Sequence, residues 1–124
     1  MSKSDIVRLQ HMLDAAKKAV KFVSGKKRED LNSEEILAMG LVRYLEIIGE
    51  ASKTVSKTVR DDNVEIPWAQ IARTRDRLIH GYFDVDLDIV WNILTKNIPL
   101  LIEQLENVLE DLKKRKYSMN VIFH

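Results

Sequence analysis

The feature that most constrains the fold is the spacing of the apolar residues, which alternates between three and four positions over long segments of the chain. This spacing gathers apolar side chains on one face of an α-helix, because a helix completes a turn about every 3.6 residues. Only four glycines and two prolines are present in 124 residues, so little in the sequence interrupts such helices. The pattern therefore predicts an almost entirely helical protein.

A first helix is predicted from Ser4 or Asp5 onward. The apolar stripe over residues 6–23 is continuous, and it stops at Ser24 and Gly25. Glycine suits the left-handed conformation in which many helices end. We therefore expect this helix to finish at Gly25.

A second helix is predicted after the charged stretch KKREDL. Asn32 can cap its first turn while Glu35, three residues later, reaches back in a capping box. Its apolar stripe covers residues 37–55 and fades into residues 60–63, which are polar and compete with the helix for backbone hydrogen bonds. We expect a turn there, between the two halves of the chain.

The second half of the sequence predicts two more helices. Pro67 fits the first position of a third helix, because its missing N–H is not needed there. That helix should end or bend near Gly81, and either Asp84 or Asp86 can cap the fourth. Pro99 should kink the fourth helix, since its ring removes one backbone hydrogen bond.

Four helices with short connections, each apolar on one stripe, must pack those stripes together. We therefore predict an all-α fold, an up-and-down bundle of four to five helices with a kinked last helix. Residues 1–116 should form a single helical domain, and residues 117–124 a C-terminal tail of no clear assignment.

Composition excludes several classes of protein. The 20 Lys and Arg residues balance 19 Asp and Glu residues, so the chain lacks the global positive charge of general nucleic-acid binders. The absence of cysteine removes disulfides and thiolate metal sites and fits a reducing compartment. The amino-terminal residues lack the apolar stretch of a signal peptide, and residues 89–102 are too interrupted to span a membrane. A cytoplasmic protein that makes no contact with a membrane is expected.

The third predicted helix carries an unusual group of residues. Two ways of drawing its apolar stripe both place Arg75 on the packing face, where a guanidinium needs a partner or a water-filled cleft. Asp76 and His80 lie four positions apart, so the carboxylate can hold the imidazole.

These residue types suit the cleavage of RNA without a metal. That reaction needs a base for the 2′-hydroxyl, stabilisation of the pentavalent phosphate and an acid for the leaving 5′-oxygen. Arg75 offers a planar fork for phosphate oxygens, His80 an acid or base near neutral pH, and Tyr82 a hydroxyl or a stacking ring. No second histidine lies nearby in the sequence, so His80 of another subunit can supply the second proton transfer. A plain alternative is a solvated helix face with Tyr82 in the core.

The string from Arg75 to Tyr82, RDRLIHGY, resembles the R-x4-6-H-x-Y motif of the HepT-like toxins of the HEPN superfamily. LEIIGEA at 45–51, IPW at 66–68 and VDLDIVW at 85–91 resemble flanking landmarks of that family in the same order. The similarity runs from the first predicted helix through the fourth. Arg73 also satisfies the permitted spacing, but Arg75 is preferred because it lies on the stripe and a small polar residue follows it.

The resemblance implies a HEPN-type bundle and a metal-independent endoribonuclease, the toxin of a type VII toxin–antitoxin pair. Arg75 and His80 would be catalytic and face the cleft of a homodimer. A cognate antitoxin with a minimal nucleotidyltransferase fold would transfer AMP from ATP to Tyr82 and so block RNA binding. No cofactor and no metal are expected.

Two neighbouring questions stay open in the sequence. Asp76 and Glu50 are predicted to support the catalytic pair. Glu46, one turn before Glu50, is equally well placed to do so, and a plain salt bridge explains either glutamate.

The alternative function is a non-catalytic HEPN-like binding subunit of a nucleotidyltransferase complex. A third possibility is a purely structural bundle.

Overall fold

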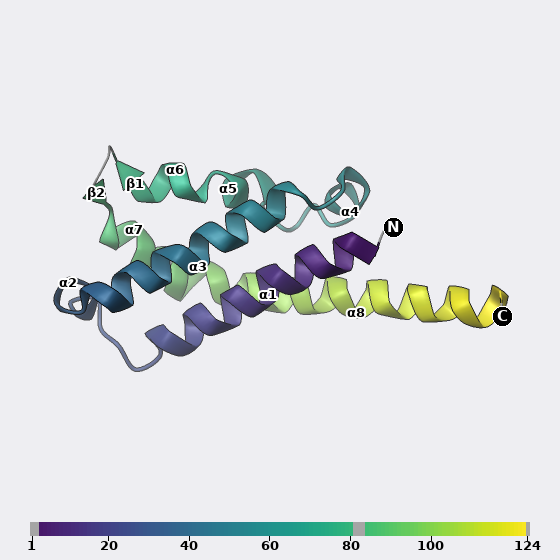
Figure 1. The fold of residues 1–124 in the computed structure, drawn as a ribbon, viewed down its shortest axis with the longest axis horizontal. Coiled ribbons are helices and arrows are strands. Elements are labelled where there is room, and N and C mark those ends of the chain that lie inside the picture. Colours follow the sequence, from purple (N-terminus) through teal and green to yellow (C-terminus); the bar gives the residue numbers. More distant parts are fainter. Residues whose placement is uncertain (1–2, 81–83, 124) are drawn as a thin grey trace.

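Helices account for most of the chain in the computed structural model (Figure 1), which describes the backbone of residues 3–80 and 84–123 and the side chains of residues 4–78 and 84–115. The α-helices are α1 (Lys3–Val23), α2 (Asp30–Ser33), α3 (Glu35–Lys53), α4 (Lys57–Asp62), α5 (Trp68–Ala72), α6 (Thr74–Leu78), α7 (Leu87–Asn92) and α8 (Ile98–Phe123). A π-helical turn, η1 (Ile93–Asn97), joins α7 to α8, and two short strands, β1 (Ile79–His80) and β2 (Asp84–Val85), pair antiparallel. The predicted all-α fold is confirmed.

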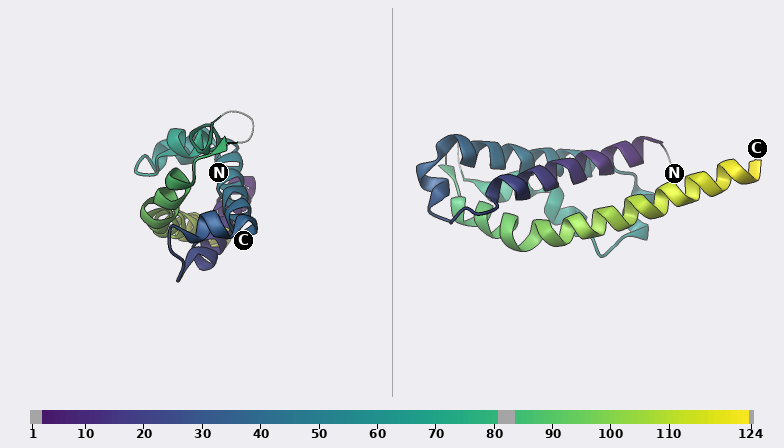
Figure 2. Two further views of the ribbon diagram at one scale, coloured as in Figure 1. Left: turned by 90° about the vertical axis from the view of Figure 1, so that its left-hand side faces the viewer. Right: turned by 90° about the horizontal axis from the view of Figure 1, so that it is seen from below.

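The core lies between α1, α3 and the segment formed by η1 and α8. Helix α1 packs against α3 on one side and α8 on the other, and α5 and α6 cover a further side of α3 (Figure 1 and Figure 2). Burial of apolar surface is the main contribution that holds such helices together. The largest side chains that are fully buried come from every part of the bundle: Leu9, Met12, Leu31, Leu41, Leu45, Ile66, Leu78, Leu94 and Leu105.

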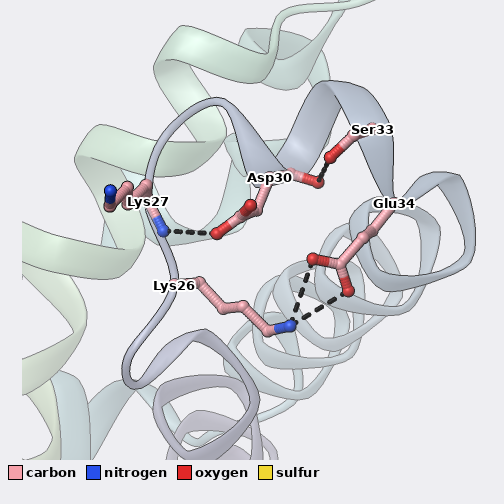
Figure 3. A network of polar contacts seen from close by, with 5 residues as sticks. All are labelled: Lys26, Lys27, Asp30, Ser33 and Glu34. Carbon is pink, nitrogen blue, oxygen red and sulfur yellow. Dashed lines mark hydrogen bonds and ion pairs between the residues drawn. The ribbon is translucent and has the colours of Figure 1, made fainter.

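The turn that connects α1 to α3 is held by polar contacts on its own residues (Figure 3). Nζ of Lys26 lies 3.0 Å from Oε1 of Glu34, and the backbone N–H of Lys27 donates to Oδ2 of Asp30 at 2.7 Å. The hydroxyl of Ser33 donates to the carbonyl of Asp30. These bonds satisfy polar groups that the helix ends leave free, so the chain reverses within a few residues.

The predicted end of the first helix is confirmed, whereas the predicted start of the second is wrong. Gly25 has a φ of 78°, the left-handed conformation expected after α1. Asn32 lies inside α2 and accepts a hydrogen bond from Nη1 of Arg28 at 2.7 Å, and α3 begins at Glu35 without a side-chain cap. The reason is the burial of Leu31, which draws this segment into a separate helical turn against the core.

Helix α4 replaces the turn that the sequence predicted at residues 60–63. The hydroxyl of Ser56 accepts from the N–H of Val59 and caps the helix, and Val59 is almost fully buried. The backbone N–H of Ser56 donates to Oδ1 of Asp5 at 2.8 Å, which ties the start of α4 to α1. Burial of Val59 and this bond to a distant carboxylate stabilise a helix that its local sequence does not favour.

The predicted third helix is divided into α5 and α6 at Arg73. The hydroxyl of Thr74 donates to the carbonyl of Ile71 at 2.7 Å, which takes up a backbone acceptor at the break. Ile71, Thr74 and Leu78 are buried, whereas Arg75 is exposed. The prediction that Arg75 lies on the packing face is therefore wrong, because Thr74, one residue earlier, takes that place.

The irregularity predicted at Pro99 takes the form of the π-helical turn η1. The N–H of Ile98 bonds to the carbonyl of Ile93, five residues earlier, and Pro99 follows at once. A π-turn shifts the hydrogen-bond pattern by one residue, which accommodates a residue that cannot donate. The chain changes direction between α7 and α8 (Figure 1). Of the two predicted caps, Asp86 is the one used, since its carboxylate accepts from the N–H of Ile89 at 3.1 Å.

Helix α8 extends past the rest of the bundle toward the carboxyl end of the chain (Figure 1). Its backbone is helical through Phe123 and so includes most of the segment 117–124 that the sequence left without an assignment. None of the helices that the structure describes is long and apolar enough to cross a membrane.

At Gly49, helix α3 lies too close to the backbone of α5 to leave room for a side chain. A Cβ atom built on Gly49 would lie 3.0 Å from the carbonyl oxygen of Ile71 and 4.0 Å from Cβ of Thr74. In the same helix, a Cβ atom on Gly40 would meet no atom within 4 Å. The absence of a side chain at Gly49 therefore lets α5 and α6 lie against α3.

Substitution of each of these two glycines by alanine should distinguish the effect of the close contact at Gly49 on stability from the effect of helix propensity. Gly40→Ala should raise the free energy of unfolding by up to about 1 kcal/mol, because alanine favours the helix. Gly49→Ala gains the same propensity but pushes α5 away from α3, so its midpoint of thermal unfolding should fall below that of Gly40→Ala. Equal stabilisation of both variants, measured by circular dichroism, would contradict the close contact.

Candidate functional site

The residues of the predicted motif lie where α6 gives way to the hairpin of β1 and β2. In that hairpin Ile79 pairs with Val85 and His80 pairs with Asp84. The N–H of Asp86 donates to the carbonyl of Leu78 at 2.7 Å, which closes the hairpin onto the end of α6. The fold therefore places the backbone of His80 directly after the helix that carries Arg75. Tyr82 lies outside the described residues.

Arg75 projects from the exposed flank of α6 and faces one acidic residue of α3. Its Nε lies 3.8 Å from Oε2 of Glu46, and its side chain is 69% exposed against 25% for Glu46. An ion pair of this length on an exposed arginine is weak, since water screens it. The guanidinium remains open to a phosphate, for which its planar fork of donors is suited.

The spacing argument that pairs Asp76 with His80 assumes one continuous helix, and the backbone of α6 does not continue as far as His80. Helix α6 ends at Leu78, and His80 belongs to β1. Residues four apart face each other only while the helix continues. The end predicted near Gly81 comes slightly later than the observed end at Leu78, because the apolar spacing runs on through Leu78. The supporting role of Asp76 therefore loses its geometric argument and stays a prediction.

Of the two glutamates left open by the sequence, Glu46 rather than Glu50 lies beside Arg75. Oε1 of Glu50 lies 3.2 Å from Nζ of Lys53 on the same helix. The side chain of Glu50 is 66% exposed, against 25% for Glu46, and its partner lies on α3 itself. Glu46 is therefore the glutamate that can support Arg75.

The surface on the Glu46 side of the motif is acidic. A hollow of about 690 Å³ is lined there by residues of α2, α3 and β2, among them Glu35, Glu46 and Asp84. A polyanion is repelled by such a lining. An approaching phosphate should therefore reach Arg75 from outside this hollow. The neighbouring cations Arg73 and Arg77 line two other hollows.

The described side chains include no group of three or more histidine, aspartate or glutamate residues that could hold a metal ion. The expectation of metal-independent chemistry is not tested by this finding and stays a prediction.

Comparison with known proteins identifies the class to which this site belongs. Residues 12–108 match the ribonuclease HepT-like family. The match includes α3, α5, α6 and the hairpin, so it contains Arg75 and His80. The chain belongs to the ribonuclease HepT-like family, and its enzyme class is endoribonuclease.

Several relatives agree with this family. A candidate RNase of Caldanaerobacter subterraneus subsp. tengcongensis is 39% identical over 105 residues, which cover 85% of this chain and 94% of the relative. A candidate ribonuclease HepT of Thermococcus cleftensis is 42% identical over 73 residues, 59% of this chain and 66% of the relative.

A longer protein of Methanocaldococcus jannaschii, named as a gamma-glutamylcyclotransferase and candidate RNase, is 33% identical over 123 residues. These residues cover 99% of this chain and 55% of that protein, so the chain spans about half of its length. No solved structure matches the chain.

The contact between Arg75 and Glu46 can be tested with two matched substitutions. Glu46→Gln removes the charge that orients the exposed guanidinium, so kcat/KM for RNA cleavage should fall several-fold. Glu110→Gln, on α8, should leave kcat/KM unchanged because Glu110 pairs with Lys114 on the same helix. A higher kcat/KM for Glu46→Gln would show instead that this carboxylate competes with RNA for Arg75.

Proposed function

We propose that the protein is the toxin of a type VII toxin–antitoxin pair and cleaves RNA without a metal, with Arg75 and His80 as its catalytic residues. The observation that carries this proposal is the exposed guanidinium of Arg75, which forms a long ion pair with Glu46 and lies on the helix that leads into His80. Family membership supplies the reaction class.

The proposed reaction is an internal transfer at one phosphate of the RNA chain. A base removes the proton of the 2′-hydroxyl, and the 2′-oxygen attacks the phosphorus. The bond from phosphorus to the 5′-oxygen breaks, and an acid gives that oxygen a proton. Arg75 stabilises the charge on the phosphate oxygens, while the imidazole of His80 carries one of the two proton transfers.

A homodimer completes this scheme, because one chain offers a single histidine in the motif. His80 of a second copy is proposed to carry the other proton transfer across a two-fold cleft. The expected substrate is tRNA or mRNA, and the expected compartment is the cytoplasm. The exposure of Arg75 in a single chain supports the dimer, since its guanidinium stays accessible to a facing subunit and to RNA.

The catalytic assignment can be tested with purified protein and RNA in the presence of a chelator. The unmodified chain should cut tRNA or mRNA, whereas Arg75→Ala and His80→Ala should lower the rate by at least about 100-fold. Arg115→Ala is a suitable control, because Arg115 is an exposed arginine on α8 that pairs with Asp111. Cutting by both motif variants would overturn the assignment. A folded chain that binds its partner but never cuts would favour the non-catalytic binding subunit.

Neutralisation is proposed to act on Tyr82. A cognate antitoxin with a minimal nucleotidyltransferase fold would transfer AMP from ATP to the tyrosine hydroxyl, with release of pyrophosphate. The new phosphodiester carries a negative charge close in sequence to Arg75, so it can compete with the RNA phosphate for the guanidinium.

Mass mapping can decide whether Tyr82 is modified. After incubation with the antitoxin, ATP and magnesium, the chain should gain one or more AMP units located at Tyr82, and RNA cleavage should be lost while the fold is kept. Tyr82→Phe should stay unmodified, and Tyr44→Phe is the control because Tyr44 stacks on Phe22 away from the motif. Modification at Tyr44 or Tyr117, or full activity after modification of Tyr82, would remove this mechanism.

A further inference from the structure

A second hollow, which we call the basic hollow, runs along α5 and reaches Arg73, at the junction with α6. It has a volume of about 720 Å³ and lies between the end of α3, helix α4 and α5. The residues that line it include Lys53, Arg60, Arg73 and Trp68, and one acidic residue, Asp61. Three cations against one anion make it electrostatically opposite to the hollow beside Glu46.

The cations of the basic hollow are only partly neutralised by their own neighbours. Within the part of the chain that the structure describes, Nε of Arg60 is buried and has no hydrogen-bond partner. The one carboxylate, Asp61, is held at 2.6 Å by Nζ of Lys57. A buried donor without a partner is unfavourable. Arg60 as a residue is only half-buried and lines the hollow, so its guanidinium can be reached by an anion there.

The walls of this hollow are fixed by contacts with the core. Val59 and Ile66 are almost fully buried and anchor α4 and the segment after it. Nδ2 of Asn63 donates to the carbonyl of Val59 at 2.8 Å, and the indole N–H of Trp68 donates to the carbonyl of Asn63 at 3.0 Å. The hollow is therefore part of the fold, and the orientation of Trp68 is set before any ligand binds.

The basic hollow is close enough to the motif to serve the same RNA strand. Arg73 precedes Arg75 by two residues, and Trp68 lies about 10 Å from Arg75 if both short helices rise by about 1.5 Å per residue. The acidic surface on the Glu46 side of Arg75 disfavours a strand there. The strand can instead run along α6 and α5 into the basic hollow.

We propose that the basic hollow binds a nucleotide of the RNA strand next to the one that is cleaved, with its phosphate on Arg60 and Arg73 and its base against Trp68. This inference rests on the proposed ribonuclease function and adds a binding subsite to it. Cationic side chains beside an aromatic ring are a common combination for single-stranded RNA, because every base has a face that can stack.

Binding can be measured separately from cleavage by using the inactive His80→Ala chain and fluorescence anisotropy. An RNA of about ten nucleotides should reach the basic hollow, whereas a dinucleotide, whose single phosphate lies at the motif, should not. Arg60→Gln should weaken binding of the longer RNA about five- to tenfold and leave the shorter RNA unaffected. In Arg60→Gln, the plot of log affinity against log salt concentration for the longer RNA should become less steep by about 0.7, which is the contribution of one phosphate contact on a single strand.

Three further variants sharpen this test. If Arg60→Gln lowers the melting temperature, Lys53→Gln can replace it, because Lys53 is exposed and its substitution should not disturb the fold. Lys53→Gln should likewise weaken binding of the longer RNA and not of the shorter one. Arg115→Gln, on α8, is the matched control and should bind both RNAs normally. Trp91→Phe leaves Trp68 as the only tryptophan of the two in the chain. In that background only the longer RNA should change the fluorescence of the remaining indole.

The outcomes separate this inference from the proposed function. Normal binding of the longer RNA by Arg60→Gln and Lys53→Gln would overturn the subsite while the ribonuclease assignment stands. Loss of binding in Arg73→Gln alone would assign Arg73 to the motif instead. Variants that bind RNA normally but escape neutralisation by the antitoxin would assign the hollow to protein binding and overturn the proposal. Absence of both cleavage and RNA binding in the unmodified chain would refute the proposed function itself.

Discussion

The close contact between Gly49 on α3 and the backbone of α5 determines where the charged residues of this protein lie. The carbonyl oxygen of Ile71 occupies the space that a side chain at Gly49 would need. Because the two segments run antiparallel at this point, the residues before Gly49 face α6 and those after it face the beginning of α5. Glu46 therefore meets Arg75, and Lys53 meets the basic hollow.

Charge along this contact changes sign from one end to the other, although the chain as a whole is almost neutral. Such a local arrangement can direct a polyanion without a general affinity for nucleic acids. The ion pairs on this surface are exposed, so each contributes little to stability. The fold depends instead on the apolar faces of α1, α3 and α8, and the polar surface is free to serve binding.

Predictions from the local sequence were wrong where a contact with a distant segment stabilised a different local structure. The burial of Leu31 separates α2 from α3, and the bond from Ser56 to Asp5 stabilises α4 in a stretch that reads as a turn. In the third predicted helix, positions 74 and 75 fit the apolar stripe about equally, since they lie three and four residues after Ile71. Thr74 takes the buried place because its small side chain fits beside Gly49.

The sequence by itself determined the all-α class, the left-handed end of α1 at Gly25 and the irregular helix at Pro99, because each depends on helical periodicity or on the backbone of one residue. It left the cap of α7 open between Asp84 and Asp86, and the structure uses Asp86. It also determined the family through the motif that begins at Arg75. Only the tertiary structure decided that Arg75 is exposed, that Glu46 rather than Glu50 is its neighbour, and that Arg60 and Arg73 share a hollow. These facts depend on how helices that are distant in the sequence pack together. The apolar pattern of a single helix does not specify which side of that helix contacts another helix.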